Sequence, residues 1–99
     1  MFVETKKEGE APSQFEPWRQ LLLNAADYIE IYGWCQNQRS LDGRVCAIGA
    51  IEAVAYGQSK DAARRALIEY LGECIVEWND APGQTEVEVV AAMRDCARS

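Results

Sequence analysis

The side chains in this sequence that could act as acids, bases, nucleophiles or metal ligands fit none of the common catalytic patterns. The chain has four cysteines and no histidine, so a serine or cysteine nucleophile lacks its usual base. A glycine-rich phosphate loop and a paired-carboxylate motif are both absent from the sequence. We therefore expect a protein that is not an enzyme and that uses no cofactor.

The cysteines are too far apart to predict a metal site. Cys35, Cys46, Cys74 and Cys96 are separated by 11, 28 and 22 residues, whereas structural zinc ligands usually come in pairs about two to four residues apart. A disulfide between Cys35 and Cys46 is conceivable, but a chain without a secretory signal keeps its thiols reduced. The sequence predicts free, metal-free thiols that are buried and inert by default.

Three glutamates, Glu69, Glu73 and Glu77, recur at four-residue steps. If one helix ran through Gly72, their carboxylates would line one face and could meet a basic partner, as a nucleic-acid-mimicking inhibitor does. A solvated helix face explains the same spacing, and Gly72 argues against an uninterrupted helix. The sequence leaves both interpretations open.

A second pattern is typical of a helix-turn-helix. Ala53 and Gly57 are four residues apart, as the small residue and the turn glycine of that motif would be. The helix expected over residues 59–71 would then read DNA, with basic side chains at Lys60, Arg64 and Arg65. Against this, Asp61 stands at the front of that helix, and a net charge of −6 leaves no basic surplus for phosphates. DNA binding is therefore the alternative hypothesis.

The polar segment over residues 34–44 offers residue types suited to protein recognition. It breaks the helical pattern, contains the turn pair Asp42-Gly43, and carries Trp34 and Arg39. With catalysis and nucleic-acid binding disfavoured, we expect a small acidic protein-interaction module. Its candidate contact residues are Trp34, Arg39, Glu69, Glu73 and Glu77.

The elements that would position these residues are helical. Apolar side chains recur at three- and four-residue steps over residues 17–32, 45–56, 59–71 and beyond 85. Residues 73–78 are apolar enough for a strand but have no partner run, which favours a short helix ending at Asn79. The sequence predicts an all-α fold, a compact bundle of four to five short helices in one domain over residues 17–99, after a flexible arm over residues 1–16.

Periodicity also gives expectations for single residues. Tyr32 and Tyr70 fall on the inward stripes of their helices. Gly49 lies inside an apolar helix, where glycine costs up to ~1 kcal/mol relative to alanine. We therefore expect a close helix–helix contact at Gly49.

The run from Trp78 to Glu88 is the most specific architectural signal. Thr85-x-x-Glu88 predicts a capping box, in which the Thr85 hydroxyl accepts from the Glu88 amide and the Glu88 carboxylate reaches back to the Thr85 amide. We expect Trp78 to be a core anchor whose indole N–H donates to a carbonyl. Asn79 and Asp80 are expected to hydrogen-bond backbone groups within the turn.

Length and composition are those of one ordinary domain. The chain has 99 residues, of which 48% are hydrophobic, enough for a single core. Its longest apolar runs are far shorter than the ~20 residues of a membrane span. The N-terminus lacks the basic start and apolar stretch of a secretory signal, so we expect a cytoplasmic protein.

Parts of the chain resemble a family of small domains of unknown function found in actinobacteria and in their phages and mobile elements. The resemblance is carried by Leu22-x-x-Ala-Ala followed by Gly33-Trp34, by Cys46-Ala-Ile-Gly-Ala-Ile51, and above all by Trp78-Asn-Asp-x-Pro-Gly-x-Thr85 with Glu88-Val89. It covers roughly residues 20–98. It implies a phage or mobile-element accessory protein acting on a host protein in the host cytoplasm, and it assigns no functional residue.

Overall fold

The structure, a computed structural model, describes residues 16–55 and 59–99. In these ranges the chain forms five helices and one two-stranded sheet. The elements follow in the order α1 (Pro17–Tyr32), β1 (Ser40–Leu41), β2 (Arg44–Val45), α2 (Ala47–Val54), α3 (Ser59–Leu71), α4 (Ile75–Asn79) and α5 (Glu86–Arg98). The prediction of a helical bundle is confirmed. The expected N-terminal arm, except Glu16, and the helix end expected at Gly57 lie outside the described residues.

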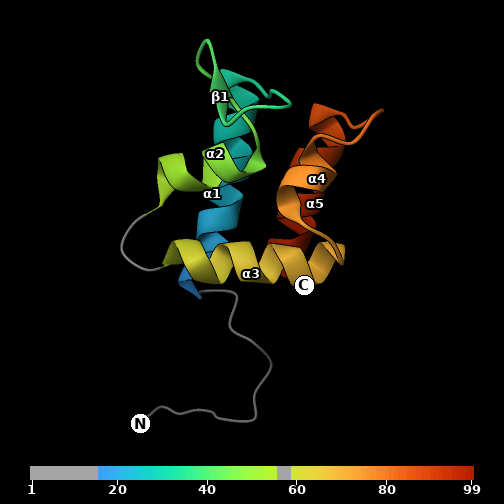
Figure 1. Cartoon of the computed structure of the whole chain (residues 1–99). Helices are drawn as coiled ribbons and strands as arrows, with labels where there is room; N and C mark the ends of the chain where they lie inside the picture. Colours follow the sequence, from blue (N-terminus) through green and yellow to red (C-terminus); the bar gives the residue numbers. More distant parts are fainter. Residues whose placement is uncertain (1–15, 56–58) are drawn as a thin grey trace, which may run out of the picture.

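The central element is α1, which packs against α5, α2 and α3 (Figure 1). Pro17 suits its first turn, where a backbone N–H would lack a partner in any case. α5 runs antiparallel to α1, since Arg19 near the start of α1 donates to the carbonyl oxygen of Ala97 near the end of α5, at 3.0 Å. A guanidinium at that position also interacts favourably with the negative end of the α5 dipole.

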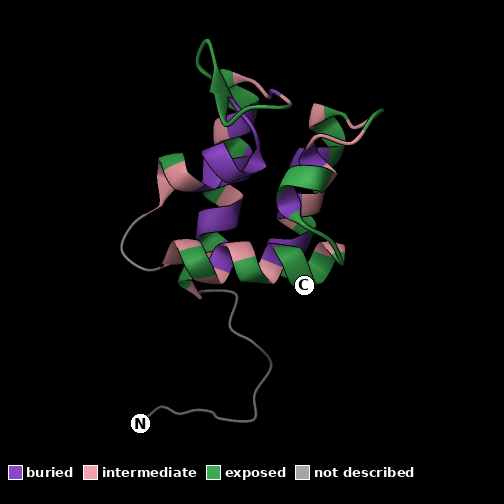
Figure 2. Cartoon of the chain, in the orientation of Figure 1, coloured by how far each residue is buried: buried purple, intermediate pink, exposed green. Residues whose placement is uncertain are grey.

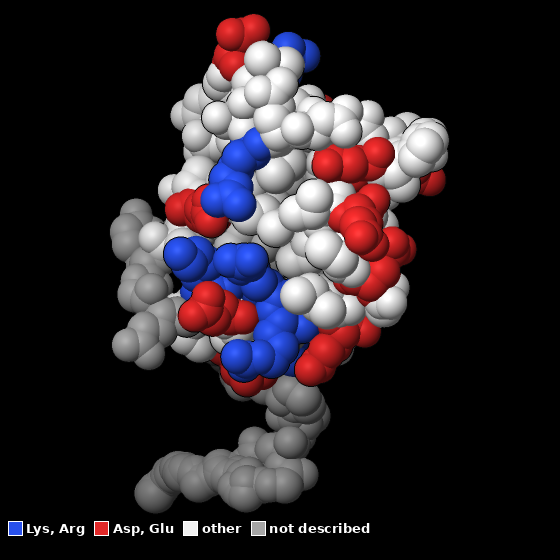
Figure 3. Space-filling view, in the orientation of Figure 1, with Lys and Arg blue, Asp and Glu red and all other residues white. Residues whose placement is uncertain are grey.

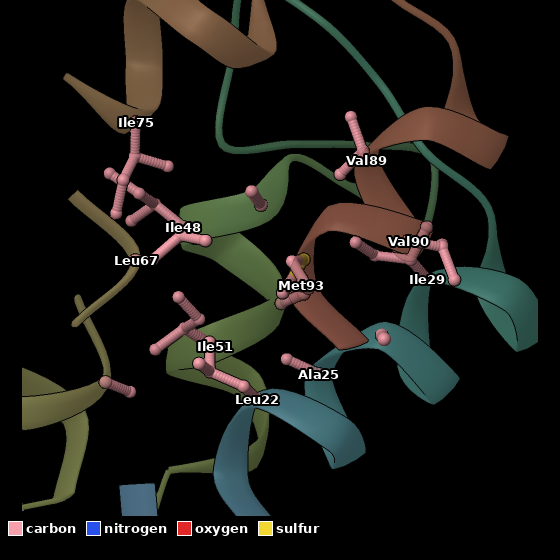
Figure 4. Close-up of a cluster of buried hydrophobic side chains, with 14 of the residues drawn as sticks. Leu22, Ala25, Ile29, Ile48, Ile51, Leu67, Ile75, Val89, Val90 and Met93 are labelled. Atoms are coloured by element: carbon pink, nitrogen blue, oxygen red, sulfur yellow. The ribbon is translucent and has the colours of Figure 1, made fainter. Parts of the chain in front are cut away.

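One apolar core joins the five helices (Figure 4). Each helix contributes at least one fully buried side chain, among them Leu22, Ile29, Ile51, Leu67, Ile75 and Met93. Burying a side chain of this size stabilises the fold by about 1.5–3 kcal/mol. The contributions are unequal, because α3 buries only Ala63 and Leu67 among its 13 residues. Figure 2 accordingly shows α3 mostly exposed or half-buried.

The inward placement predicted for the two tyrosines is wrong. Tyr32 is 55% exposed and Tyr70 is 45% exposed. Both lie in the last turn of their helices, where the helical period continues but the packing against the core does not. Tyr32 instead lies against Tyr28, with ring centroids 4.4 Å apart.

The segment between α1 and α2 contains a short hairpin that the sequence did not predict. β1 and β2 pair antiparallel, with Ser40 opposite Val45 and Leu41 opposite Arg44. The turn predicted at Asp42-Gly43 is confirmed, and both residues have positive φ, as a two-residue hairpin turn requires. Strands of two residues are too short to show an alternating pattern.

Candidate functional site

Asn79, the last residue of α4, is the centre of a buried polar network. Its side chain is 1% exposed. The Oδ1 atom accepts from the Trp34 indole Nε1 at 2.8 Å and from the Ala47 amide at 3.0 Å. The Nδ2 atom donates to the Cys35 carbonyl oxygen at 3.1 Å and to Asp80 Oδ1 at 2.9 Å. Two acceptor and two donor positions are therefore all used. We call these five residues the Asn79 hub.

Further bonds tie the segment after α1 to the turn after α4. Gln36 Nε2 donates to the carbonyl oxygens of Asn79 and Ala81, at 3.1 and 3.0 Å. The Asn37 amide donates to Asp80 Oδ1 at 2.8 Å. Together with the hub, these bonds fix residues 34–37 against α4 and the turn that follows it.

The hub also completes the start of α2. The first amides of a helix have no partner within the helix. At α2 the Ala47 amide is satisfied by Asn79 Oδ1, and the Gly49 amide donates to Cys46 Sγ at 3.3 Å. The position of α2 is therefore coupled to that of α4 through one amide side chain.

A cavity of about 170 Å³ lies beside the hub, between the segment before α2 and α4. Its apolar lining includes Ile48, Ile75 and Val76, and its charged lining includes Arg39 and Asp80. Sites for small molecules and cofactors usually have volumes of about 300–1,000 Å³. This cavity is therefore better matched to one side chain of a partner than to a cofactor.

The structure brings only some of the predicted contact residues to this cavity. Arg39 lines it and is exposed, and its Nη1 atom pairs with both carboxylate oxygens of Glu52 at 3.1 Å. Trp34 is half-buried and packs against the core, and its indole N–H is engaged by Asn79. Trp34 therefore holds the wall of the cavity in place.

The three glutamates do not form one helix face. Gly72 has φ +75°, and its amide donates to the Ile68 carbonyl oxygen at 2.8 Å, so α3 ends there with a left-handed cap. Glu69 therefore lies on α3, Glu73 in the link, and Glu77 on α4. All three are exposed. Figure 3 shows acidic side chains gathered over α4 and the C-terminal end of α3.

The basic residues of the alternative hypothesis lie on the first half of α3. Figure 3 shows basic side chains gathered there, and those that α3 supplies are Lys60, Arg64 and Arg65. The rest of the helix-turn-helix pattern fits less well. Ala53 is exposed, so the small residue expected where the two helices cross does not lie between them. Asp61 is exposed in the first turn of α3.

Gly49 makes a close contact, but its partner is not a helix. A Cβ atom at this position would collide with the backbone carbonyl oxygen of Arg39. The same oxygen accepts from the Cys46 amide at 3.1 Å. The expected helix–helix approach is therefore wrong. The absence of a side chain instead lets α2 lie against the segment that carries Arg39.

The capping box forms in part. Thr85 Oγ1 accepts from the Glu88 amide at 3.2 Å, as predicted. The reciprocal bond differs, because the Glu88 carboxylate accepts from the Thr85 hydroxyl while the Thr85 amide donates to Gln84 Oε1. Trp78 is half-buried and packs against the core. The expectation that the side chains of Asn79 and Asp80 bond backbone groups within their own turn is wrong, because their backbone partners belong to Cys35, Asn37 and Ala47.

All four cysteines are free thiols. Cys35, Cys46 and Cys96 are buried, while Cys74 is exposed, contrary to expectation. Burial raises the pKa of Cys96 to about 11 and also raises the pKa of Cys35. Among the described residues, no group of three or more cysteine, aspartate or glutamate side chains could hold a metal ion.

Comparison with known proteins identifies the family. A model described as a family of unknown function, DUF6197, matches residues 16–99. Because the match covers most of the chain, the protein belongs to this family. No curated protein and no solved structure matched the chain. Within residues 16–55 and 59–99, no helix is long and apolar enough to cross a membrane.

Proposed function

We propose that this member of a family without an assigned activity is a small acidic protein-interaction module whose binding site is the cavity beside the Asn79 hub. The cavity itself is the observation that carries the proposal. It combines apolar lining, including Val76, which is 46% exposed, with charged lining from Arg39 and Asp80. Buried anchors of protein interfaces fill pockets of this kind.

The rigidity of the cavity walls supports a binding role. The Asn79 hub and the two bonds of Gln36 hold the wall before α2 against α4. A site that is already ordered pays less conformational entropy when a partner binds. We therefore expect the partner to meet the cavity largely in the shape described.

Charge and family resemblance indicate the kind of partner. The chain carries a net charge of −6, and the exposed carboxylate of Glu77 follows Val76 on α4. A partner segment with an apolar anchor flanked by basic side chains would complement this region. The resemblance to actinobacterial and phage domains supports an accessory protein of a phage or mobile element that acts on a host protein.

The experiment compares three immobilised proteins in one actinobacterial lysate, with captured proteins identified by mass spectrometry. Val76→Glu places a charge in the lining of the cavity, and Val87→Glu places the same charge on α5, where Val87 is 77% exposed. A partner captured by the wild type and Val87→Glu but lost with Val76→Glu supports the proposal. Identical captured sets from all three proteins, each folded by circular dichroism, would contradict it.

DNA binding by α3 is a second candidate, favoured by the basic side chains gathered on that helix (Figure 3). It predicts that the wild type shifts duplex DNA at sub-micromolar concentration in physiological salt. Changing Lys60, Arg64 and Arg65 together to glutamate would abolish that shift, and added salt would weaken it steeply. We expect no shift, and the cavity variant Val76→Glu provides a control because it leaves α3 unchanged.

A further inference from the structure

Asp80, which lines the cavity beside the Asn79 hub, uses only one of its two carboxylate oxygens inside the protein. Its Oδ1 atom accepts from the Asn37 amide at 2.8 Å and from Asn79 Nδ2 at 2.9 Å. Within residues 16–55 and 59–99, neither a hydrogen bond nor an ion pair reaches its Oδ2 atom. The residue is half-buried, so an acceptor oxygen remains for a donor from a partner.

The other charged residue of the lining, Arg39, already has a counter-ion. Its Nη1 atom pairs with both carboxylate oxygens of Glu52 at 3.1 Å. On the opposite side of the cavity, Glu77 on α4 and Glu73 in the link before it are exposed, and Figure 3 shows acidic side chains gathered over this region. The charge left without a partner at the cavity is therefore negative, which favours a cationic group.

The remaining lining of the cavity includes apolar side chains, those of Ile48, Ile75 and Val76. The volume of about 170 Å³ suits one side chain, as argued above. A side chain that complements both parts of the lining needs an apolar stem and a positive charge at its end. Lysine has this form, because its methylene stem can lie along apolar surface while its ammonium group meets an anion.

We propose that the partner residue that fills this cavity is a lysine. Its stem lies against Ile48, Ile75 and Val76, and its ammonium group pairs with Asp80 Oδ2. This inference rests on the proposed function and makes the apolar anchor and the basic side chain of the partner one residue. Asp80 is then the residue that determines the specificity of the site.

The bonds of Asp80 favour lysine over arginine. A guanidinium binds a carboxylate best through two parallel hydrogen bonds, one to each oxygen. Here Oδ1 already accepts two bonds from within the protein, so only Oδ2 is available. An ammonium group needs just one oxygen of the carboxylate. Asn37 and Gln38 also line the cavity, and their amide oxygens are acceptors of the kind that the other ammonium protons require.

NMR titration with three capped amino acids tests the inference on the whole chain. The probes are the N-acetyl methylamides of lysine, norleucine and arginine, and norleucine has the carbon stem of lysine without the ammonium group. Shifts of the Asn37 and Val76 backbone amides report occupation of the cavity and give the dissociation constants. We expect lysine to bind about fivefold more tightly than norleucine or arginine, the effect of one exposed ion pair.

Two variants that each remove one negative charge locate the source of this preference. Asp80→Asn keeps an oxygen to accept from the Asn37 amide, and it should bind lysine and norleucine equally. Glu77→Gln is the matched control, because Glu77 is exposed and lies outside the lining, and it should keep the preference for lysine. High salt offers a test without any substitution, since it should remove the advantage of lysine in the wild type and leave norleucine binding in place.

The inference would be overturned by a wild type that binds norleucine or arginine as tightly as lysine, or by a lysine preference that persists in Asp80→Asn or in high salt. If norleucine binds as well as lysine, the cavity still accepts an apolar anchor, and the proposed function is not affected. If no probe shifts the cavity amides, the inference also fails, and the lysate comparison with Val76→Glu then decides the proposed function separately.

Discussion

Two polar side chains in the run from Trp78 to Glu88 show how much burial changes the contribution of a hydrogen bond to stability. Asn79 is 1% exposed and joins residues more than thirty positions away, at Trp34 and Ala47. Thr85 is exposed and bonds the amide three residues ahead. If the side chain is removed, water can take its place at Thr85 but not at Asn79. Loss of the hydrogen bonds should therefore lower the free energy of unfolding much more at Asn79 than at Thr85.

The largest effect is expected for Asn79→Ala. The change leaves the Trp34 indole N–H, the Ala47 amide and the Cys35 carbonyl oxygen without their buried partner, and each such group costs about 1–3 kcal/mol. We expect the free energy of unfolding to fall by at least about 3 kcal/mol, measured by urea denaturation. A loss below about 1 kcal/mol would mean that the hub does not form as described.

Gly49→Ala is expected to have the next largest effect. The sign of its change in stability shows whether helix propensity or the contact with the Arg39 carbonyl oxygen dominates. Helix propensity alone predicts stabilisation by up to about 1 kcal/mol. The added methyl group would instead press on the Arg39 carbonyl oxygen, and overpacking of this kind costs about 1–3 kcal/mol. The urea midpoint should therefore fall. A rise would show that the segment before α2 can move away at little cost.

Thr85→Ala should destabilise by about 1 kcal/mol, since it removes the partner of the Glu88 amide at the start of α5. Thr85→Ser keeps the hydroxyl and serves as the matched control, with a midpoint close to that of the wild type. Equal midpoints for the alanine and serine variants would show that the cap contributes nothing.

The smallest effect is expected at the exposed ion pair of α1 with α5. A hydrogen bond from the Arg94 guanidinium, at 2.7 Å, holds the pKa of Glu30 below its ordinary value. Because the folded pKa is the lower one, this stabilisation is complete above the unfolded carboxyl pKa of about 4.3 and is lost as pH falls through the folded value.

Arg94→Gln tests this dependence. Its urea midpoint should lie slightly below that of the wild type at pH 7, and the difference should shrink as the pH is lowered from 7 toward 3 and Glu30 takes up its proton. A difference that stays constant between these pH values would assign it to packing of the arginine side chain rather than to charge.

The candidate site is partly predictable from the sequence. The composition of its segment singles out Arg39, and Arg39 does line the cavity. Ile48, Ile75 and Val76 in its lining belong to helices that the sequence predicts. No local pattern indicates that α2 and α4 lie side by side. Asn79 stands within a turn motif, and the motif gives no sign of its bonding partners because they lie more than thirty residues earlier in the chain.

The sequence by itself determined the local features of this protein. Helical periodicity, a proline at the start of α1, the turn pair Asp42-Gly43 and the cap at Thr85 each depend on neighbours within a few residues, so a linear pattern records them. Only the tertiary structure decided what Asn79 bonds, what lies against Gly49 and where the core stops covering Tyr32 and Tyr70. Those outcomes depend on which distant segments pack against one another, and the spacing of residues along the chain does not show which segments do so.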